Sequence, residues 1–336
     1  MKRTQRRWLL TGLTAGLAAG LGAWLVARAS ALRRALARRV DPLTRQAVAG
    51  LGLPAESRYM EANGLRFHVV VAGPTDGPLA VLLHGFPECW YSWRHQIAPL
   101  AQAGYRVVVP DQRGYNLTDK PAGVRSYTID RLAADVRGLV HAFGRQRALI
   151  IGHDWGGVVA WRLAMDHPEL VEKLVVMNAP HPAAFARELR SGWSQRLRSW
   201  YAAFFQLPWL PETLFTLSPP ASARLFFRRT AVRKDAFSEA DLAVMASAMA
   251  QPGAMRSMIH WYRAALRHRT APERLVIEPP MLLIWAEDDL ALGKPLTYEL
   301  EEWVPDLSVR YIPRCGHWVQ NEVPEQVNRL LLDFLS

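Results

Sequence analysis

The chain has 336 residues, half of them hydrophobic and about a fifth charged, which is enough for one large domain or for one domain with an insertion. Its net charge of +11 does not indicate nucleic-acid binding, because residues 1–39 carry nine Lys and Arg and no acid, which leaves +2 for the rest. The two cysteines, Cys89 and Cys315, exclude a disulfide framework; free thiols are expected, although one bridge between them stays open.

The first predicted element is an apolar segment near the amino terminus. Residues 8–27 are twenty consecutive uncharged and mostly apolar residues, and a helix of that length spans about 30 Å, the hydrocarbon thickness of a bilayer. We expect an uncleaved transmembrane anchor, followed by an interfacial amphipathic helix over 30–40. Gly12, Gly16 and Gly20 would line one face of the anchor and permit a homodimer, or they merely fill a weakly hydrophobic segment.

A cleaved signal peptide is the alternative interpretation of this segment, and it would make the protein exported. The tripeptide ARA at 27–29 resembles a cleavage site. The arginines between residues 33 and 39 argue against cleavage, since positive charge after an apolar segment hinders translocation. We assign residues 1–56 to the anchor and its juxtamembrane helix. Basic residues lie on both sides of the anchor, so they do not choose its orientation.

After residue 56 the pattern changes to short apolar runs that alternate with helical stretches. The later runs are rich in leucine and β-branched residues, which is typical of parallel strands buried on both faces. The sequence therefore predicts an α/β fold with a mostly parallel sheet flanked by helices. The expected strands are residues 65–72, 79–85, 105–111, 148–152, 173–179, 280–287 and 307–313.

The loop HGFPE at 84–88 directly follows the apolar residues LAVLL of the second expected strand. Gly85 permits a tight turn, so that the backbone N–H of Phe86 can point toward a reacting oxygen. His84 precedes the turn, and we expect it to brace the loop rather than to take part in the chemistry.

The strand at 148–152 leads into the motif GHDWGG, which fits a sharp turn between a strand and a helix. Many hydrolases hold a serine nucleophile at the centre of such a turn, and here the position is Asp154. A carboxylate is ionised at neutral pH, so it can attack a saturated carbon without a base. A plain helix N-cap is the alternative role. The N–H groups of Phe86 and Trp155 would form an oxyanion hole beside Asp154, and His153 would brace the turn.

About a hundred residues between the expected strands 173–179 and 280–287 contain many aromatics and no convincing strand. We expect residues 182–275 to form a helical lid, inserted into an α/β core made of residues 57–181 and 276–336. Such a lid would cover the carboxyl ends of the strands, where open α/β sheets bind ligands.

Two later residues complete a triad in the order nucleophile, acid, histidine, which is the order expected of the α/β-hydrolase fold. Asp289 follows the strand at 280–287, and His317 follows the last expected strand. Asp289 would orient His317, and His317 would act as a general base on water. Glu287 and Asp288 are alternatives to Asp289, which is favoured because it lies furthest into the loop.

The segments HGFPECWYSWRHQI, PDQRGYNLTDKP, GHDWGG, QLPWLPE, HWYRA and CGHWVQNEVPE together resemble the epoxide hydrolases of the α/β-hydrolase superfamily. The resemblance covers residues 57–336 and is particularly clear for the membrane-anchored epoxide hydrolases 3 and 4 and their bacterial relatives. It implies two lid tyrosines that hold the epoxide oxygen and donate a proton. Tyr262 in HWYRA matches the second of them. Tyr201 in YAAFFQLP matches the first by its distance from the glutamine, with packing as its alternative role.

The sequence thus predicts an epoxide hydrolase that forms an alkyl ester on Asp154 and hydrolyses it with water activated by His317 and Asp289. The product would be a vicinal diol and the substrate a small apolar epoxide, whose identity and stereochemistry stay open. The expected chemistry requires no metal or organic cofactor, and we expect no nucleic-acid partner.

Three other functions are compatible with parts of the sequence. A haloalkane or fluoroacetate dehalogenase would use the same nucleophile, but Tyr262 argues against it because a halide leaving group needs no proton. A binding protein of the same fold would have lost turnover, although all expected catalytic positions are present. A serine esterase is disfavoured, since Gly-x-Ser-x-Gly does not occur.

Overall fold

The structure, a computed structural model, describes residues 40–336. Within these residues no helix combines the length and the apolar character needed to cross a membrane. The expected anchor at 8–27, its glycine face and the interfacial helix up to residue 39 lie outside the described residues.

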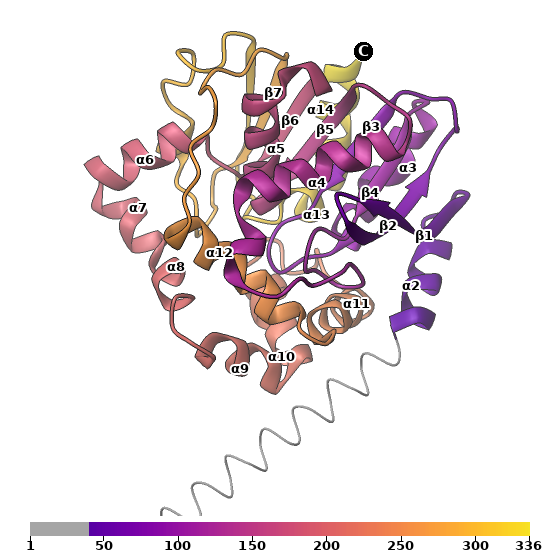
Figure 1. Cartoon of the computed structure of the whole chain (residues 1–336), viewed down its shortest axis with the longest axis horizontal. Coiled ribbons are helices and arrows are strands. Elements are labelled where there is room, and N and C mark those ends of the chain that lie inside the picture. Colours follow the sequence, from indigo (N-terminus) through magenta and orange to yellow (C-terminus); the bar gives the residue numbers. More distant parts are fainter. Residues whose placement is uncertain (1–39) are drawn as a thin grey trace, which may run out of the picture.

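An eight-stranded sheet forms the centre of the domain (Figure 1). Its strands lie in the order β1-β2-β4-β3-β5-β6-β7-β8. The pairs β1–β2 and β2–β4 are antiparallel, and all pairs from β4 to β8 are parallel, as the apolar runs predict. The bounds are β1 (Ala55–Ala62), β2 (Leu65–Ala72), β3 (Leu79–Leu83), β4 (Arg106–Pro110), β5 (Ala148–His153), β6 (Val171–Met177), β7 (Met281–Ala286) and β8 (Leu307–Ile312).

The strand β1 was not predicted from the sequence. It lies at the edge of the sheet and reads AESRYMEA, with polar side chains exposed along most of its length. Asn63 and Gly64 join it to β2, and both have positive φ, 46° and 71°. Asn-Gly with two positive φ angles is typical of a two-residue hairpin turn, so this dipeptide is the signal that could have predicted β1.

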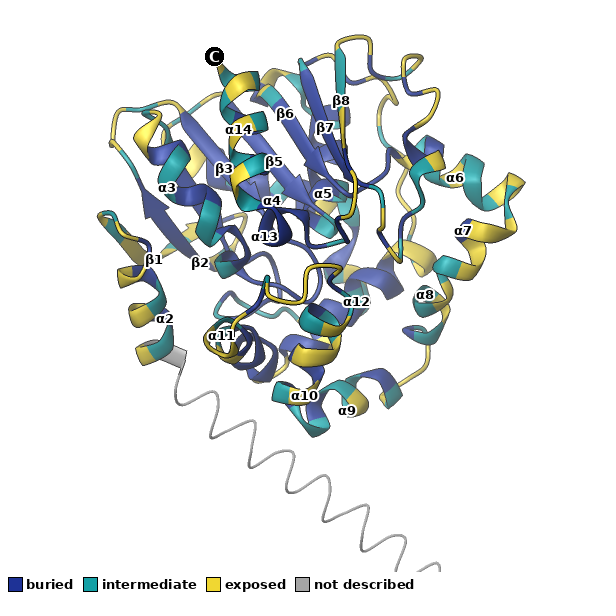
Figure 2. Cartoon of the chain, turned by 180° about the vertical axis from the view of Figure 1, so that it is seen from behind, coloured by how far each residue is buried: buried dark blue, intermediate teal, exposed yellow. Residues whose placement is uncertain are grey.

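Helices cover both faces of the sheet. Figure 1 shows α4 and α5 on one face, and Figure 2 shows α3 and α14 on the other. Every residue of β3, β5 and β7 is consequently buried, which is why these strands read as continuous apolar runs. The bounds are α2 (Val40–Ala49), η1 (Trp90–Trp93), α3 (Arg94–Gln102), η2 (Val124–Tyr127), α4 (Ile129–Ala142), α5 (Trp155–Asp166), η3 (Pro168–Leu170), η5 (Lys294–Thr297), α13 (Val319–Glu322) and α14 (Pro324–Leu335).

Between β6 and β7 the chain forms helices and no strand, and these helices run from the left edge to the bottom of the molecule in Figure 1. The longest, α12, buries an aromatic face and exposes basic residues on its other side. The bounds are α6 (Pro182–Ser191), α7 (Trp193–Arg198), α8 (Trp200–Phe204), α9 (Leu210–Leu217), α10 (Pro219–Ala223), the π-helical turn η4 (Arg224–Arg229), α11 (Glu239–Ala250) and α12 (Ala254–Arg267).

Both cysteines are free and buried. The Cys89 Sγ lies 3.9 Å from the sulfur of Met245, and the Cys315 thiol lies 3.7 Å from the carbonyl oxygen of Gly316. The bridge that the sequence left open therefore does not form.

Candidate active site

Asp154 stands at the turn between β5 and α5. Its backbone angles, φ 49° and ψ −121°, are rare for an L-residue, and such strain costs on the order of 1–3 kcal/mol. Glycine permits the close packing around this turn. A Cβ on Gly156 would lie 2.0 Å from the carbonyl oxygen of Leu83, and one on Gly85 would lie 2.5 Å from the Cβ of Asp154. The motif thus holds the carboxylate at the carboxyl edge of the sheet, against the loop that follows β3.

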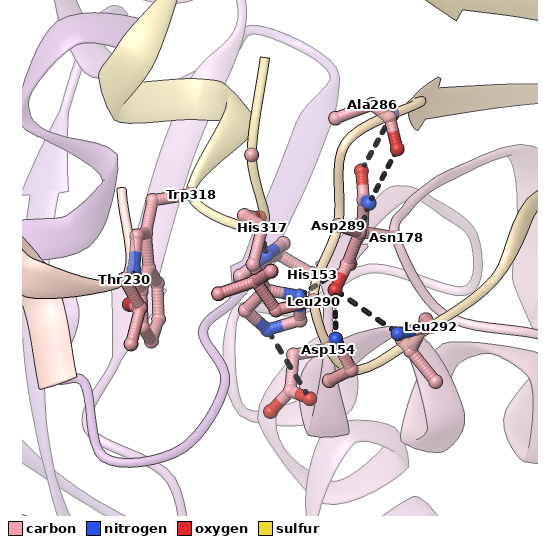
Figure 3. Close-up of polar contacts among 12 residues, drawn as sticks. His153, Asp154, Asn178, Thr230, Ala286, Asp289, Leu290, Leu292, His317 and Trp318 are labelled. Atoms are coloured by element: carbon pink, nitrogen blue, oxygen red, sulfur yellow. Dashed lines mark hydrogen bonds and ion pairs between the residues drawn. The ribbon is translucent and has the colours of Figure 1, made fainter. Parts of the chain in front are cut away.

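His317 lies between two carboxylates (Figure 3). Its Nδ1 is 2.6 Å from Oδ2 of Asp289, and its Nε2 is 3.6 Å from Oδ2 of Asp154. Burial lowers the pKa of His317, but the charges of Asp289 and Asp154 and the hydrogen bonds to both outweigh it and raise the pKa well above its ordinary value. Three residues from three separate strand ends therefore meet. Glu287, an alternative to Asp289, instead pairs with Lys294.

Asp289 is fixed by four hydrogen bonds. Its Oδ1 accepts from the backbone N–H of Ala291 at 2.7 Å and of Leu292 at 3.0 Å, and its Oδ2 accepts from Asn178 Nδ2 at 2.7 Å as well as from His317 (Figure 3). Burial raises the pKa of Asp289, but the charge of His317 and these donors outweigh it and hold the pKa below its ordinary value. Asn178 was not singled out from the sequence, although an asparagine directly after a buried strand is a usable signal.

The backbone amide of Phe86 points at the Asp154 carboxylate. It donates to Oδ1 at 2.8 Å. Trp155, the second expected donor, is the first residue of α5, where a backbone N–H has no partner within the helix. Both expected amides therefore lie at the Asp154 turn, and the first of them already contacts its carboxylate.

Buried polar groups brace both loops. His84 Nδ1 donates to the carbonyl oxygen of Gly85 at 3.0 Å, and His153 Nε2 donates to that of His317 at 2.8 Å. Glu88 was missed by sequence reasoning, although it ends the HGFPE loop. Its carboxylate accepts from the N–H of Gly85 at 2.8 Å and lies 2.9 Å from His153 Nδ1. Burial raises the pKa of Glu88, but the charge of His153 and the hydrogen bonds that the Glu88 carboxylate accepts outweigh burial and lower this pKa to about 2.

Two tyrosines from the inserted helices lie beside Asp154. The rings of Tyr201 in α8 and Tyr262 in α12 are 5.9 Å apart, and Tyr262 packs edge-on against Phe86 at 5.2 Å and Trp155 at 5.0 Å. Burial first, and then the charge of Asp154, raise the pKa of both hydroxyls above the ordinary value. Both hydroxyls therefore stay protonated and can donate to an oxygen close to Asp154.

The wall around these groups is aromatic. Phe205 and Phe226 pack edge-on against Phe86, and Phe215 contacts both of them. Such a wall excludes water, and ionic and hydrogen-bonding interactions are stronger in the resulting low-dielectric site. The arrangement thus combines the Asp154 carboxyl group, a histidine held between two acids and two neutral tyrosine hydroxyls in an apolar setting.

Comparison with known proteins agrees with this geometry. Residues 78–324 match the family model of the alpha/beta hydrolase fold. The chain is 42% identical over 279 residues to the AB hydrolase superfamily protein YfhM of Bacillus subtilis, covering 83% of this chain and 97% of that one. It is 36% identical over 284 residues to human epoxide hydrolase 4, and the match covers 82% of this chain and 76% of the human protein. A crystal structure of Bacillus megaterium epoxide hydrolase with an inhibitor is similar at a TM-score of 0.77 and 31% identity, covering 83% of this chain and 99% of that one.

Proposed function

The chain belongs to the α/β-hydrolase fold family and is an epoxide hydrolase, and we propose that it opens the epoxide through a covalent ester on Asp154. One observation carries the proposal. The Asp154 carboxylate sits at a strained turn, with one oxygen 2.8 Å from the Phe86 amide and the other 3.6 Å from His317. A carboxylate held in this way can serve first as a nucleophile and then as the acyl group that is hydrolysed.

In the first step, an Asp154 oxygen attacks a ring carbon and the carbon–oxygen bond of the epoxide breaks. The leaving alkoxide receives a proton from one tyrosine and a hydrogen bond from the other, and Tyr262 and Tyr201 are the proposed donors. Two neutral donors aimed at the oxygen where charge develops stabilise the transition state without reorganising. Their separation of 5.9 Å, ring to ring, supports joint action on one oxygen.

In the second step, His317 takes a proton from water, and the hydroxide attacks the ester carbonyl carbon on Asp154. The N–H groups of Phe86 and Trp155 would stabilise the oxyanion, and Asp289 the imidazolium. Forming the ester removes the negative charge of Asp154, which is one cause of the raised His317 pKa. His317 therefore releases its proton more readily in the ester, when a base is required. When the tetrahedral intermediate collapses, the imidazolium of His317 protonates the leaving alkoxide, which is released as a vicinal diol. The proton left on the Asp154 carboxyl returns to the tyrosinate, which restores both the Asp154 carboxylate and the tyrosine hydroxyl.

The helical insertion and the amino terminus complete the proposal. Residues 182–275 would act as a lid on the core of residues 57–181 and 276–336, which is supported by the two tyrosines that they contribute. Residues 8–27 would anchor the enzyme in a membrane, and their glycine face would permit a homodimer. A small apolar epoxide is the proposed substrate, since aromatic side chains surround Asp154.

A single turnover in ¹⁸O-labelled water tests the covalent step. With enzyme in excess, the label should enter the Asp154 carboxylate and be absent from the first diol released. Label in that diol would mean that water attacks the epoxide directly. Asp154→Ala should abolish diol formation. His317→Gln should accumulate an alkyl-enzyme, whose mass exceeds that of the free protein by the mass of one epoxide molecule. Release of fluoride from fluoroacetate without diol formation from any epoxide would instead identify a dehalogenase.

A further inference from the structure

A cavity of about 630 Å³ lies on the solvent side of α12, between that helix, α9 and η2. Neither Asp154 nor Tyr262 lines it. The catalytic machinery described above gives this cavity no role, so its lining must be explained separately.

One face of α12 supplies the basic lining of the cavity. Arg256, His260, Arg263 and Arg267 follow one another at intervals of four, three and four residues, which aligns them along one side of a helix. Tyr262 belongs to a different face, where it meets the aromatic wall of the active site. The helix therefore separates the basic cavity from the reacting groups.

The cavity carries net positive charge. Its lining contains three arginines and one acid, Glu212, which pairs with Arg263 at 2.5 Å. Among the residues that the structure describes, Arg267 donates only to neutral acceptors on Gln206, the side-chain oxygen at 3.0 Å and the carbonyl oxygen at 2.8 Å. Arg256 is exposed and forms no hydrogen bond or ion pair with any residue between 40 and 336. Two guanidinium charges are thus uncompensated by the described protein.

His260 adds a polar group without a partner. Its Nδ1 is shielded from solvent and makes no hydrogen bond within the described part of the chain. Burial first, and then the nearby Arg263, lower the pKa of His260 to about 4, so the ring is neutral at physiological pH. Twelve buried side-chain nitrogen and oxygen atoms lack a hydrogen-bond partner among the described residues, and His260 is the one residue among them that lines this cavity.

The remaining wall of the cavity combines the polar side chains of Gln206, Thr213 and Thr216 with a group of apolar ones. The apolar group includes Val124, Pro208, Trp209 and Leu217. Trp209 is 71% exposed, which is unusual for so large an apolar side chain. A simple anion would leave this surface in water, whereas a ligand with an anionic head and an apolar chain would cover it and match the arginines at the same time.

We propose that this cavity is an accessory site that binds an amphiphile through its anionic head, a carboxylate or a phosphate, with the apolar chain against Trp209 and Leu217. Guanidinium groups bind both heads through paired, charge-assisted hydrogen bonds. Arg256 is the principal contact, because its charge is not shared with a protein acceptor. The ligand is distinct from the reacting epoxide, so the proposal goes beyond the hydrolase activity and does not depend on it.

Calorimetric titration of the full chain in phosphatidylcholine nanodiscs tests the site with four probes: octyl phosphate, octanoate, octanol and inorganic phosphate. We expect octyl phosphate, octanoate or both to bind, and Arg256→Gln to raise the Kd at least ten-fold. Arg190→Gln is the matched control, because Arg190 is exposed on α6 and lies outside the cavity. It should leave the Kd unchanged.

The comparison between the two octyl probes identifies which head the site prefers. Equal binding of octanol and octyl phosphate would overturn the anionic head, and equal affinity for inorganic phosphate would overturn the apolar chain. Identical Kd values for Arg256→Gln and Arg190→Gln would overturn the site itself. Asp154→Ala should bind the probe like the unaltered chain, so failure of the covalent mechanism and failure of this site are distinguishable.

Discussion

Loss of the Tyr262 hydroxyl should slow the opening of an epoxide, whereas displacement of a halide would not need this proton donor. Tyr262→Phe keeps the ring that packs against Phe86 and Trp155 but removes the donor. We expect kcat/KM for epoxide hydrolysis to fall by about 10²–10³-fold, the usual effect of deleting one such donor. Tyr201→Phe should also lower it, and the double variant should be slower than either. Diol formation measures the rates.

Tyr298→Phe is the control for this series, because Tyr298 is 47% exposed and contacts neither tyrosine ring. It should leave kcat/KM unchanged. Full epoxide turnover by Tyr262→Phe would refute the assignment of Tyr262 as a donor.

The pH dependence of His317 should differ between the free enzyme and the ester. In the free enzyme the charges of Asp289 and Asp154 raise its pKa well above the ordinary value. The ester lacks the Asp154 charge, so the pKa of His317 should be lower there. Only neutral His317 acts as a base, so ester hydrolysis should be lost as pH falls through this lower pKa.

Two measurements check this difference: rapid-quench rates of ester decay against pH, and an NMR titration of His317 in the free enzyme, assigned with His317→Gln. Asp289→Asn should lower the pKa of His317 in the free enzyme, because it removes the charge that raises this pKa most. Identical pKa values for ester decay and for the free enzyme would contradict the coupling.

Residues at strand ends could be predicted, and residues that act across strands could not. Asp154, Asp289 and His317 each follow an apolar run, so their proximity follows from the geometry of a parallel sheet. Asn178 follows a buried strand and Glu88 ends the HGFPE loop, but the side chains that they bind lie far away in the chain, and no local pattern identifies those partners.

At the scale of elements, Glu322 in α13 joins the His317 loop to the inserted helices. Its buried Oε2 accepts from the N–H groups of Gly316 at 3.1 Å, Val232 at 2.9 Å and Arg233 at 2.9 Å. A single carboxylate oxygen thus fixes the residue next to His317 and the segment between η4 and α11. Movement of either segment would alter the position of the base.

Glu322→Gln should therefore affect both stability and turnover. The other carboxylate oxygen, Oε1, accepts from the N–H of Trp318 at 3.3 Å. An amide can place its single oxygen at only one of the two positions, so at least one buried N–H loses its acceptor, which costs about 1–3 kcal/mol. We expect a lower Tm and a lower kcat. Glu325→Gln, at an exposed position in α14, is the control. Equal Tm values for the two variants would show that the Glu322 carboxylate does not stabilise the fold.

The elements themselves could be predicted where burial dictates composition. The six inner strands each contain an apolar run, and the edge strand β8 keeps enough apolar residues to be predicted, although Arg310 and Tyr311 are exposed. β1 escapes this pattern because it lies at the edge and exposes its polar side chains. Boundaries shift for local reasons: the expected strand 173–179 ends at Met177, because Asn178 turns to φ 41° and donates to Asp289.

At the scale of the whole molecule, the fold class follows from the alternation of strands and helices, but the packing of the inserted helices does not. Their aromatic content predicts burial without stating which ring meets which. Tyr201 in α8 and Tyr262 in α12 are separated in the chain by α9, α10, η4 and α11, and only the tertiary structure brings them together beside Asp154.

The last prediction concerns deletion of residues 1–39, which precede the described domain in the chain. The described domain starts with α2, which packs against α11 and β1. Deletion of residues 1–39 removes the apolar segment and nine positive charges but leaves every described element in place. We expect kcat for a water-soluble epoxide to stay within about two-fold, whereas flotation with phosphatidylcholine vesicles should be lost, because the proposed anchor at residues 8–27 would provide the hydrophobic attachment.

Replacing the four arginines between residues 33 and 39 with glutamine is the matched control, since it lowers the charge and retains residues 8–27. That variant should still float with neutral vesicles, because attachment depends on the apolar segment and not on charge. Flotation of the deleted chain would contradict the anchor. A mature chain purified from cells without its first 29 residues would instead establish the cleaved signal peptide, and the enzyme would then act outside the compartment in which it is made.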